Sequence, residues 1–197
     1  MFKRVLVLAP HTDDGEFGCG ATLSRLSDEG SEVYYIAFSA PLIELEDEVV
    51  KAIGVLGLTD VRINQYPVRK FHTVRQEILD YMIALKLELK PDLVLVPSPH
   101  DQHQDHMVIS QEAFRAFRTV SLLAYDLPWN YLTFDTKLFI KVTKADMDKK
   151  MKALECYGTQ AGRHYLNKAF IYGLASVRGV QVQCEYAECF EVIRWVI

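Results

Sequence analysis

The stretch Val5-Leu6-Val7-Leu8-Ala9-Pro10-His11-Thr12-Asp13-Asp14 decides how the fold begins. Its first five residues are an unbroken aliphatic run, which is typical of a strand covered on both faces, as in a parallel sheet. Its last four residues are polar and include an imidazole and two carboxylates. Three glycines follow, and Ala21–Leu26 then predicts a helix that ends near Gly30. The chain therefore opens as a buried strand, a polar turn and a helix.

The rest of the chain continues this alternation. Further strands are expected at Val33–Phe38, Val61–Ile63, Leu93–Val96, Ser121–Tyr125, Leu138–Val142 and Ala187–Val196. Further helices are expected at Glu44–Leu56, Thr73–Lys90, Asp105–Arg118, Lys144–Cys156 and Arg163–Ser176. This order of elements predicts an α/β, Rossmann-like three-layer fold with a mainly parallel sheet. Because the sequence shows no internal repeat and no linker, we expect residues 1–197 to form a single domain.

The composition limits the classes of protein and partner. The 197 residues carry a formal net charge of -4, and a weakly negative surface does not attract nucleic acid or an anionic membrane. No apolar run reaches the roughly 20 residues of a membrane helix, and Val5–Ala9 is shorter than the ~7–15 apolar residues of a secretory signal. The four cysteines form no C-x-x-C pair, which favours reduced thiols. We therefore expect a cytoplasmic protein without a membrane span or a nucleic-acid partner.

A second polar cluster, His103-Gln104-Asp105-His106, follows the expected strand Leu93–Val96. Open α/β sheets bind their ligands at the carboxyl ends of the strands, so we expect this cluster to meet His11-Thr12-Asp13-Asp14. Imidazoles and carboxylates are the ligands that zinc and similar divalent ions use at catalytic sites. The groups that do not bind the ion would remain free to move protons.

Two other interpretations of these residues need to be weighed. Asp13, Asp14 or Asp105 could simply cap the helix that each precedes or begins. Alternatively, Gly15, Gly18 and Gly20 could cradle the phosphates of a dinucleotide. Their order is G-x-x-G-x-G rather than G-x-G-x-x-G, and the acidic residues at this turn would repel a pyrophosphate. Two clusters, each following a buried strand, favour the metal site, and the glycines are better explained by close packing of the helix on the sheet.

The two clusters resemble the paired signature of the LmbE/PIG-L family, which comprises zinc-dependent N-acetylglucosaminyl deacetylases. Pro10-His11-Thr12-Asp13-Asp14 matches the P-H-x-D-D form of the first motif, with Gly15-Glu16 in place of an immediate glutamate. Softer similarities continue in order along nearly the whole chain, at Tyr125–Asn130, Lys152–Gln160, Arg178–Gly179 and Ala187–Phe190.

The resemblance implies a role for each polar residue of the two clusters. His11, Asp14 and His106 would bind the metal, which would be zinc, with another divalent ion as the alternative. Asp13 would be the general base that acts on a water activated by the metal. A cationic His103 would stabilise the developing oxyanion or protonate the leaving amine, and Asp105 would orient an imidazole, that of His103.

The resemblance also implies a substrate, an N-acetylated sugar or sugar conjugate of the N-acetylglucosamine type. Weaker candidates for substrate binding are Trp129, Arg163, Tyr165 and His100. The segment Ser39–Glu48 departs from the family pattern, because Leu45 stands where a sugar-contacting arginine is common. Hydrolysis of a non-sugar N-acyl amide and a non-catalytic metal- or sugar-binding domain remain as alternatives. Some members of the family form oligomers, so a homo-oligomer is expected.

Overall fold

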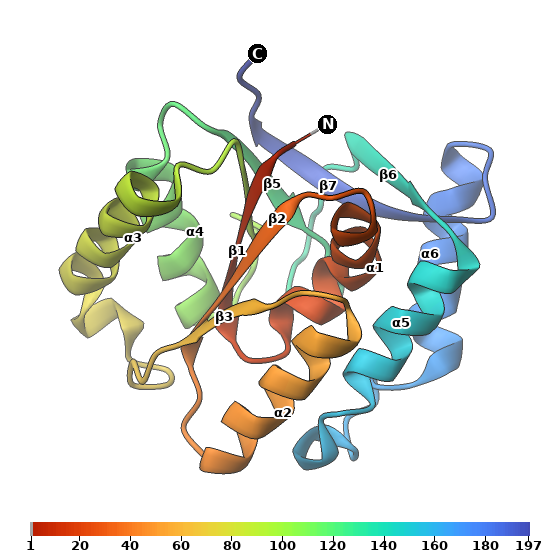
Figure 1. Ribbon diagram of the computed structural model, residues 1–197, viewed down its shortest axis with the longest axis horizontal. Coiled ribbons are helices and arrows are strands. Elements are labelled where there is room, and N and C mark those ends of the chain that lie inside the picture. The colour runs from red at the N-terminus through yellow and green to blue at the C-terminus, as the bar shows by residue number, and fades with distance from the viewer. Residues whose placement is uncertain (1) are drawn as a thin grey trace.

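In the computed structural model, which describes residues 2–197, the chain is built around a seven-stranded sheet (Figure 1). The strands are β1 (Arg4–His11), β2 (Glu32–Ser39), β3 (Asp60–Ile63), β4 (Leu93–Pro97), β5 (Ser121–Tyr125), β6 (Leu138–Val142) and β7 (Tyr186–Arg194). The helices are α1 (Asp14–Asp28), α2 (Ile43–Val55), α3 (Arg75–Leu89), α4 (Gln104–Ala116), α5 (Lys144–Leu154) and α6 (Lys168–Gln181), with short 3-10 turns η1 (Phe71–Thr73) and η2 (Gly158–Gln160). The strand order is β3-β2-β1-β4-β5-β7-β6. The first five strands in this order are parallel, and β7 runs antiparallel to both its neighbours, so the expected mainly parallel sheet is confirmed.

Helices cover both faces of the sheet, which confirms the three-layer arrangement (Figure 1). Successive residues of a strand point to opposite faces. In β1, Val5 and Val7 accordingly belong to the core beneath α1, α2, α5 and α6, whereas Leu6 and Leu8 belong to the core beneath α3 and α4. Both cores are buried, which explains why the strand is apolar without interruption.

The strand order reverses between β1 and β4, and this reversal positions the two polar clusters. Val5 pairs with Leu93 and Val7 pairs with Leu95 in parallel register. The chain leaves β1 toward β2 on one side and leaves β4 toward β5 on the other. Such a switch point opens a crevice at the carboxyl ends of the strands. The segments that follow His11 and Pro97 both lie at that edge.

Helix α1 begins at Asp14, well before the expected start at Ala21, and it is broken at Cys19, where φ is -149° and ψ is 20°. The break is stabilised by a buried ion pair between Lys150 and Glu188, with Nζ 2.6 Å from Oε1. Lys150 also donates to the carbonyl of Phe17 (2.7 Å), where the first half of the helix ends. Glu188 accepts from the backbone N–H groups that open the second half, at distances of 3.2 and 2.7 Å. Each charge thus lies against the helix end that it stabilises.

The early glycines of α1 allow the helix to lie close to the sheet. A β-carbon at Gly15 would overlap the ring of Tyr35, and one at Gly18 would overlap the ring of Tyr125. The sequence interpretation of these glycines as packing residues therefore agrees with the structure.

Two of the expected helices begin at a later residue than expected. Helix α6 begins at Lys168 instead of Arg163, because residues 161–167 form a loop and the Asn167 side chain caps the helix by accepting from the Phe170 N–H (2.8 Å). In the expected helix Thr73–Lys90, Thr73 is the last residue of the 3-10 turn η1, and the α-helix α3 begins at Arg75.

Among residues 2–197, no helix is long and apolar enough to cross a bilayer, and all four cysteines are unpaired.

The substitution Lys150→Met should destabilise the fold strongly. It leaves the Glu188 carboxylate buried without its partner, for which we expect a loss of about 3–5 kcal/mol in the free energy of unfolding. The double variant Lys150→Met/Glu188→Gln should lose less, because no unpaired charge remains. Urea unfolding of both variants measures the difference.

The adjacent residue provides a matched control. Lys149 forms an exposed ion pair with Asp28, so Lys149→Met should change the free energy of unfolding by about 0.5 kcal/mol or less. An equal loss for the two lysine variants would show that the buried pair does not stabilise the break in α1.

Candidate metal and catalytic site

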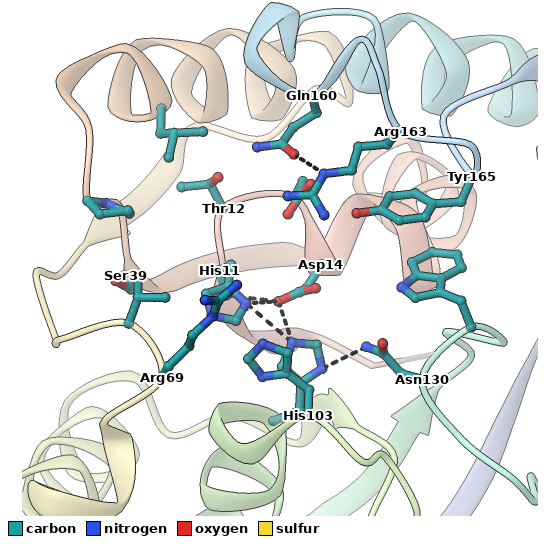
Figure 2. Close-up of a pocket in the computed structure, with 16 residues that line it drawn as sticks. His11, Thr12, Asp14, Ser39, Arg69, His103, Asn130, Gln160, Arg163 and Tyr165 are labelled. Carbon is teal, nitrogen blue, oxygen red and sulfur yellow. Dashed lines mark hydrogen bonds and ion pairs between the residues drawn. The ribbon is translucent and has the colours of Figure 1, made fainter.

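Three side chains from the two polar clusters converge on one point at the carboxyl edge of the sheet (Figure 2). His11 ends β1, Asp14 is the first residue of α1 and His106 lies in the first turn of α4. Asp14 Oδ2 is 3.1 Å from His11 Nδ1 and 3.1 Å from His106 Nε2. The two ring nitrogens are 3.3 Å apart. These three atoms form a nearly equilateral triangle.

The triangle fits a bound divalent ion. Zinc bonds of ~2.0–2.1 Å in tetrahedral geometry separate neighbouring ligand atoms by about 3.3 Å. Two imidazoles and one carboxylate are also a common donor set of catalytic zinc sites. The ring nitrogens of His11, His103 and His106 form a wider alternative set, whose atoms lie within 4.8 Å of one another.

A carboxylate contacts the second ring nitrogen of each candidate imidazole ligand. Asp101 Oδ2 is 2.7 Å from His106 Nδ1, and Asp105 Oδ2 is 3.1 Å from His11 Nε2. Such contacts fix the orientation and tautomer of histidines that bind metals. Asp101 and Asp105 are both buried, so these orientations are held by the protein interior.

The pKa values around the triangle show that it favours positive charge. Burial lowers the pKa of His11 and His106, but the adjoining carboxylates outweigh it and raise the values to about 9 and about 10. Burial acts on Asp14 in the opposite sense, yet the two imidazoles hold its pKa well below the usual range. A divalent cation can supply the positive charge that protons supply in its absence.

Asp13 is the one carboxylate of the first cluster that is left free. It is the N-cap residue of α1, but its side chain makes no capping hydrogen bond. Burial, followed by the charge of Asp14, raises the pKa of Asp13 to about 6. A general base works best when its pKa lies near the working pH. The position and pKa of Asp13 therefore suit a base.

A buried cluster beneath Asp13 holds its turn in place. The carbonyl of Thr12 lies 2.7 Å from the Tyr157 hydroxyl and 3.0 Å from the Tyr35 hydroxyl. Both hydroxyls also contact the carboxyl group of Glu16, which is fully buried. Burial raises the pKa of Glu16 to about 8, although the hydrogen bonds from the two tyrosines act in the opposite sense. The cluster fixes the backbone that carries Asp13 and Asp14.

His103 faces the triangle as a neutral imidazole. Its Nδ1 accepts the N–H of Asp105 at 3.2 Å and thereby caps α4. Burial, together with His106 and His11, lowers the pKa of His103 to about 4. Because Nδ1 is an acceptor, the ring proton lies on Nε2. His103 can therefore donate one hydrogen bond without carrying charge.

A cavity of about 330 Å³ is lined by six residues of the two clusters: His11, Thr12, Asp13, Asp14, His103 and His106. Its wall also contains residues that lie outside the two motifs (Figure 2). They are Ser39, Pro41, Leu45, Val68, Arg69, Trp129, Asn130, Gln160, Arg163 and Tyr165. A few polar groups among apolar and aromatic side chains are typical of a site for a small molecule.

Residues 6–117, more than half of the chain, match the PIG-L family, which is described as GlcNAc-PI de-N-acetylase. The chain belongs to the PIG-L family. Its relatives include the uncharacterized deacetylase YaiS of Escherichia coli strain K12, which is 27% identical over 165 residues. That match covers 78% of this chain and 89% of YaiS.

Solved structures share the fold. The conserved protein TT1542 from Thermus thermophilus is 26% identical, with a TM-score of 0.85 over 100% of this chain and 97% of that one. N,N'-diacetylchitobiose deacetylase from Pyrococcus horikoshii is 21% identical, with a TM-score of 0.82 over 98% of this chain and 84% of that one. A 4-carboxy-2-hydroxymuconate hydratase from Pseudomonas putida is 19% identical, with a TM-score of 0.83 over 99% and 98%. The fold by itself therefore does not specify the reaction.

The structure differs from three expectations for the site of this PIG-L family member. The carboxylate of Asp105 contacts His11 and not His103, because His103 turns its Nδ1 to the backbone N–H of Asp105. His100 does not line the cavity. Its ring contacts Glu191 at 2.9 Å instead, and its side chain is half exposed. The cationic His103 that was expected is also disfavoured, since its pKa is lowered.

Other expected residues lie at the cavity, and some that line or support it were missed. Trp129, Arg163 and Tyr165 line it as anticipated for substrate-binding residues. Asp101 was missed, although it lies in the same loop as the second cluster. Arg69 was also missed, because no motif surrounds it in the sequence.

The two candidate ligand sets predict different effects of mutation. With Asp14 as the third ligand, Asp14→Asn should weaken zinc binding at least about 100-fold, because zinc prefers an anionic oxygen to an amide at such sites. His103→Gln should weaken it by less than about tenfold. Competition with a zinc-binding dye measures both. The reverse order would assign the third position to His103.

Proposed function

We propose that this protein is a divalent-metal-dependent hydrolase that removes the acetyl group from an N-acetylated amino sugar or its conjugate. The family to which the chain belongs supports the deacetylase class. The observation that carries the proposal is that two adjacent carboxylates lie in different environments. Asp14 lies within the triangle, whereas Asp13 faces the cavity free of any structural hydrogen bond from its side chain to the helix.

His11, Asp14 and His106 would hold the ion. A divalent ion at these residues supplies a Lewis acid and lowers the pKa of water, which provides a nucleophile at neutral pH. Zinc fits the donor set best, and manganese or iron are alternatives for the same ligands.

Asp13 then acts as the base and afterwards as the acid. It takes a proton from the water that attacks the acetyl carbon, and its raised pKa lets it keep that proton. As the carbon–nitrogen bond breaks, Asp13 passes the proton to the amine. Acetate and the free amine are the products, and no other reactant is required.

His103 stabilises the charge that develops on the carbonyl oxygen. Its Nε2–H can donate a hydrogen bond to that oxygen, while Nδ1 remains fixed by the N–H of Asp105. A donor that is already oriented costs no reorganisation when the reaction occurs.

The wall opposite the histidines suits a sugar ring. Trp129 and Tyr165 are stacked with ring centroids 4.2 Å apart and an interplanar angle of 5°. Both line the cavity, and the edge of Phe17 packs against each of them. A rigid aromatic surface of this kind packs against the C–H groups of a sugar while polar groups bind its hydroxyls. The deacetylase from Pyrococcus horikoshii acts on such a sugar, N,N'-diacetylchitobiose, by its name.

A cytoplasmic location and a homo-oligomeric state remain predictions from the sequence.

The test offers the protein N-acetylglucosamine, its glycosides and N,N'-diacetylchitobiose as substrates and measures the acetate released. Removal of the metal with a chelator should abolish the activity, and added zinc should restore it. Asp13→Asn should keep its metal and lower kcat by about 10²–10⁴-fold, which is the usual contribution of a general base.

Asp28→Asn is the matched control, because it makes the same chemical change at an exposed ion pair far from the cavity. Loss of metal from Asp13→Asn would show that the roles of the two aspartates are exchanged. Hydrolysis of non-sugar N-acyl amides, without hydrolysis of these sugars, would show that the substrate is not an N-acetylated amino sugar. A metal-loaded protein that hydrolyses neither class would be a binding domain.

A further inference from the structure

Arg69 adopts a backbone conformation that arginine rarely adopts. It is the third residue of the turn Pro67–Lys70, which is closed by a hydrogen bond from the N–H of Lys70 to the carbonyl of Pro67 (3.0 Å). Its φ is 62°, and a positive φ at this position of a turn is normally reserved for glycine or asparagine. Strained residues of this kind are concentrated at functional sites. The turn itself gains nothing from the arginine side chain.

The turn is tied directly to the candidate catalytic residues. The N–H of Arg69 donates to Asp105 Oδ2 at 2.6 Å, and the N–H of Phe71 donates to Oδ1 at 3.2 Å. The same Oδ2 lies 3.1 Å from His11 Nε2. Asp105 therefore holds the turn against a proposed metal ligand, and the Arg69 side chain lines the cavity beside His11 (Figure 2).

The guanidinium of Arg69 is uncommitted. Within residues 2–197 it forms no ion pair and donates no side-chain hydrogen bond, and the residue is exposed. Five other arginines are paired with carboxylates, among them Arg62 with Glu88, Arg75 with Glu112 and Arg178 with Asp126. Among the described residues, Arg4, Arg118, Arg163 and Arg194 form no such pair, but of these only Arg163 lines the cavity. An unpaired cation held in a strained turn at a cavity wall is available to a ligand.

A second guanidinium, that of Arg163, enters the cavity from the opposite side in Figure 2. Its Nε donates to the neutral amide of Gln160 at 2.8 Å, and its Cζ lies 5.8 Å from the ring centre of Tyr165. Among the described residues it has no carboxylate within ion-pair distance. The charge of Arg163 acts on Asp13, which lines the same cavity, and a substrate anion between the two guanidiniums would be attracted by both. Guanidinium groups bind phosphate and carboxylate through paired hydrogen bonds.

We propose that Arg69, together with Arg163, binds an anionic group of the substrate, a phosphate or carboxylate carried by the amino sugar. This proposal rests on the proposed deacetylase function and narrows its substrate class. Arg69 thereby selects for substrates with an anionic group. Neither the turn nor a substrate without such a group requires an arginine at this position.

The test measures binding of amine products, which the enzyme cannot hydrolyse. Glucosamine 1-phosphate and glucosamine 6-phosphate carry a phosphate at different positions, muramic acid carries a carboxylate, and glucosamine, which has the same amine, is the reference without an anionic group. Calorimetric titration of the zinc-loaded protein should show at least one anionic sugar bound about tenfold or more tightly than glucosamine. Which of the three binds distinguishes phosphate from carboxylate.

Substitutions at Arg69 should remove that preference. Arg69→Gln and Arg69→Gly should weaken binding of the anionic sugar at least about tenfold and leave glucosamine unchanged. Arg69→Lys should be intermediate, because a lysine keeps the charge but not the paired donors. Arg69→Gly also removes the strain, so its melting temperature should be equal to or above that of the wild type.

Lys90→Gly is the matched control. Lys90 also has a positive φ, 47°, at the end of α3, and glycine is favoured there for the same reason. This variant should be as stable as Arg69→Gly and should bind all the sugars like the wild type.

The outcomes separate this proposal from the proposed function. Equal binding of glucosamine and the anionic sugars, or anion binding that survives Arg69→Gln, overturns the anion subsite even where the protein is a deacetylase. Anion binding that depends on Arg69 supports the subsite even where no acetate is released, and in that case it is the deacetylase function that fails.

Discussion

The site depends on the parallel pairing of β1 with β4 in the middle of the sheet. Val5 and Val7 pair with Leu93 and Leu95, and this register sets where the segments after His11 and Pro97 emerge. A strand advances about 3.3 Å per residue, so a slip of two residues would move one segment by about 6–7 Å along the other. The facing nitrogens of His11 and His106 are only 3.3 Å apart. Backbone hydrogen bonds in the sheet interior therefore determine whether a metal site exists.

The same edge concentrates negative charge, and this concentration is useful only in the presence of a cation. Asp101 and Asp105 each contact an imidazole of the triangle, and Asp14 contacts both imidazoles. Carboxylates that lie so close together raise one another's pKa unless positive charge lies between them. Protons on the histidines can provide that charge, and in the proposed metal-bound state a divalent ion would provide it. Asp13 lies outside the triangle, and burial together with the charge of Asp14 raises its pKa although His11 and Arg163 act in the opposite sense.

Local patterns predicted the strands and the position of the site, whereas contacts between distant segments could not be predicted. Apolar runs identify β1 and β4 because each strand is buried on both faces, and polar residues at their ends follow from the fold class. The break of α1 at Cys19 depends on Lys150 and Glu188, which no pattern near Cys19 reveals. Asp105 was assigned to the wrong imidazole, because its partner is set by how the loop after β3 packs on α4.

The proposed substrate contacts, in contrast, come from segments outside the sheet whose side chains the fold constrains less. Leu45 stands where the family resemblance places a sugar-contacting arginine, and here it contributes an apolar surface to the cavity. Arg69 reaches the same cavity from the turn between β3 and η1, so a guanidinium is still present but comes from another loop. The fold gains nothing from an arginine with a positive φ, and glycine would form the same turn without strain. The side chain at position 69 is thus accounted for by the proposed anionic substrate, whereas residues 11–14 and 101–106 are accounted for by the proposed metal site and reaction.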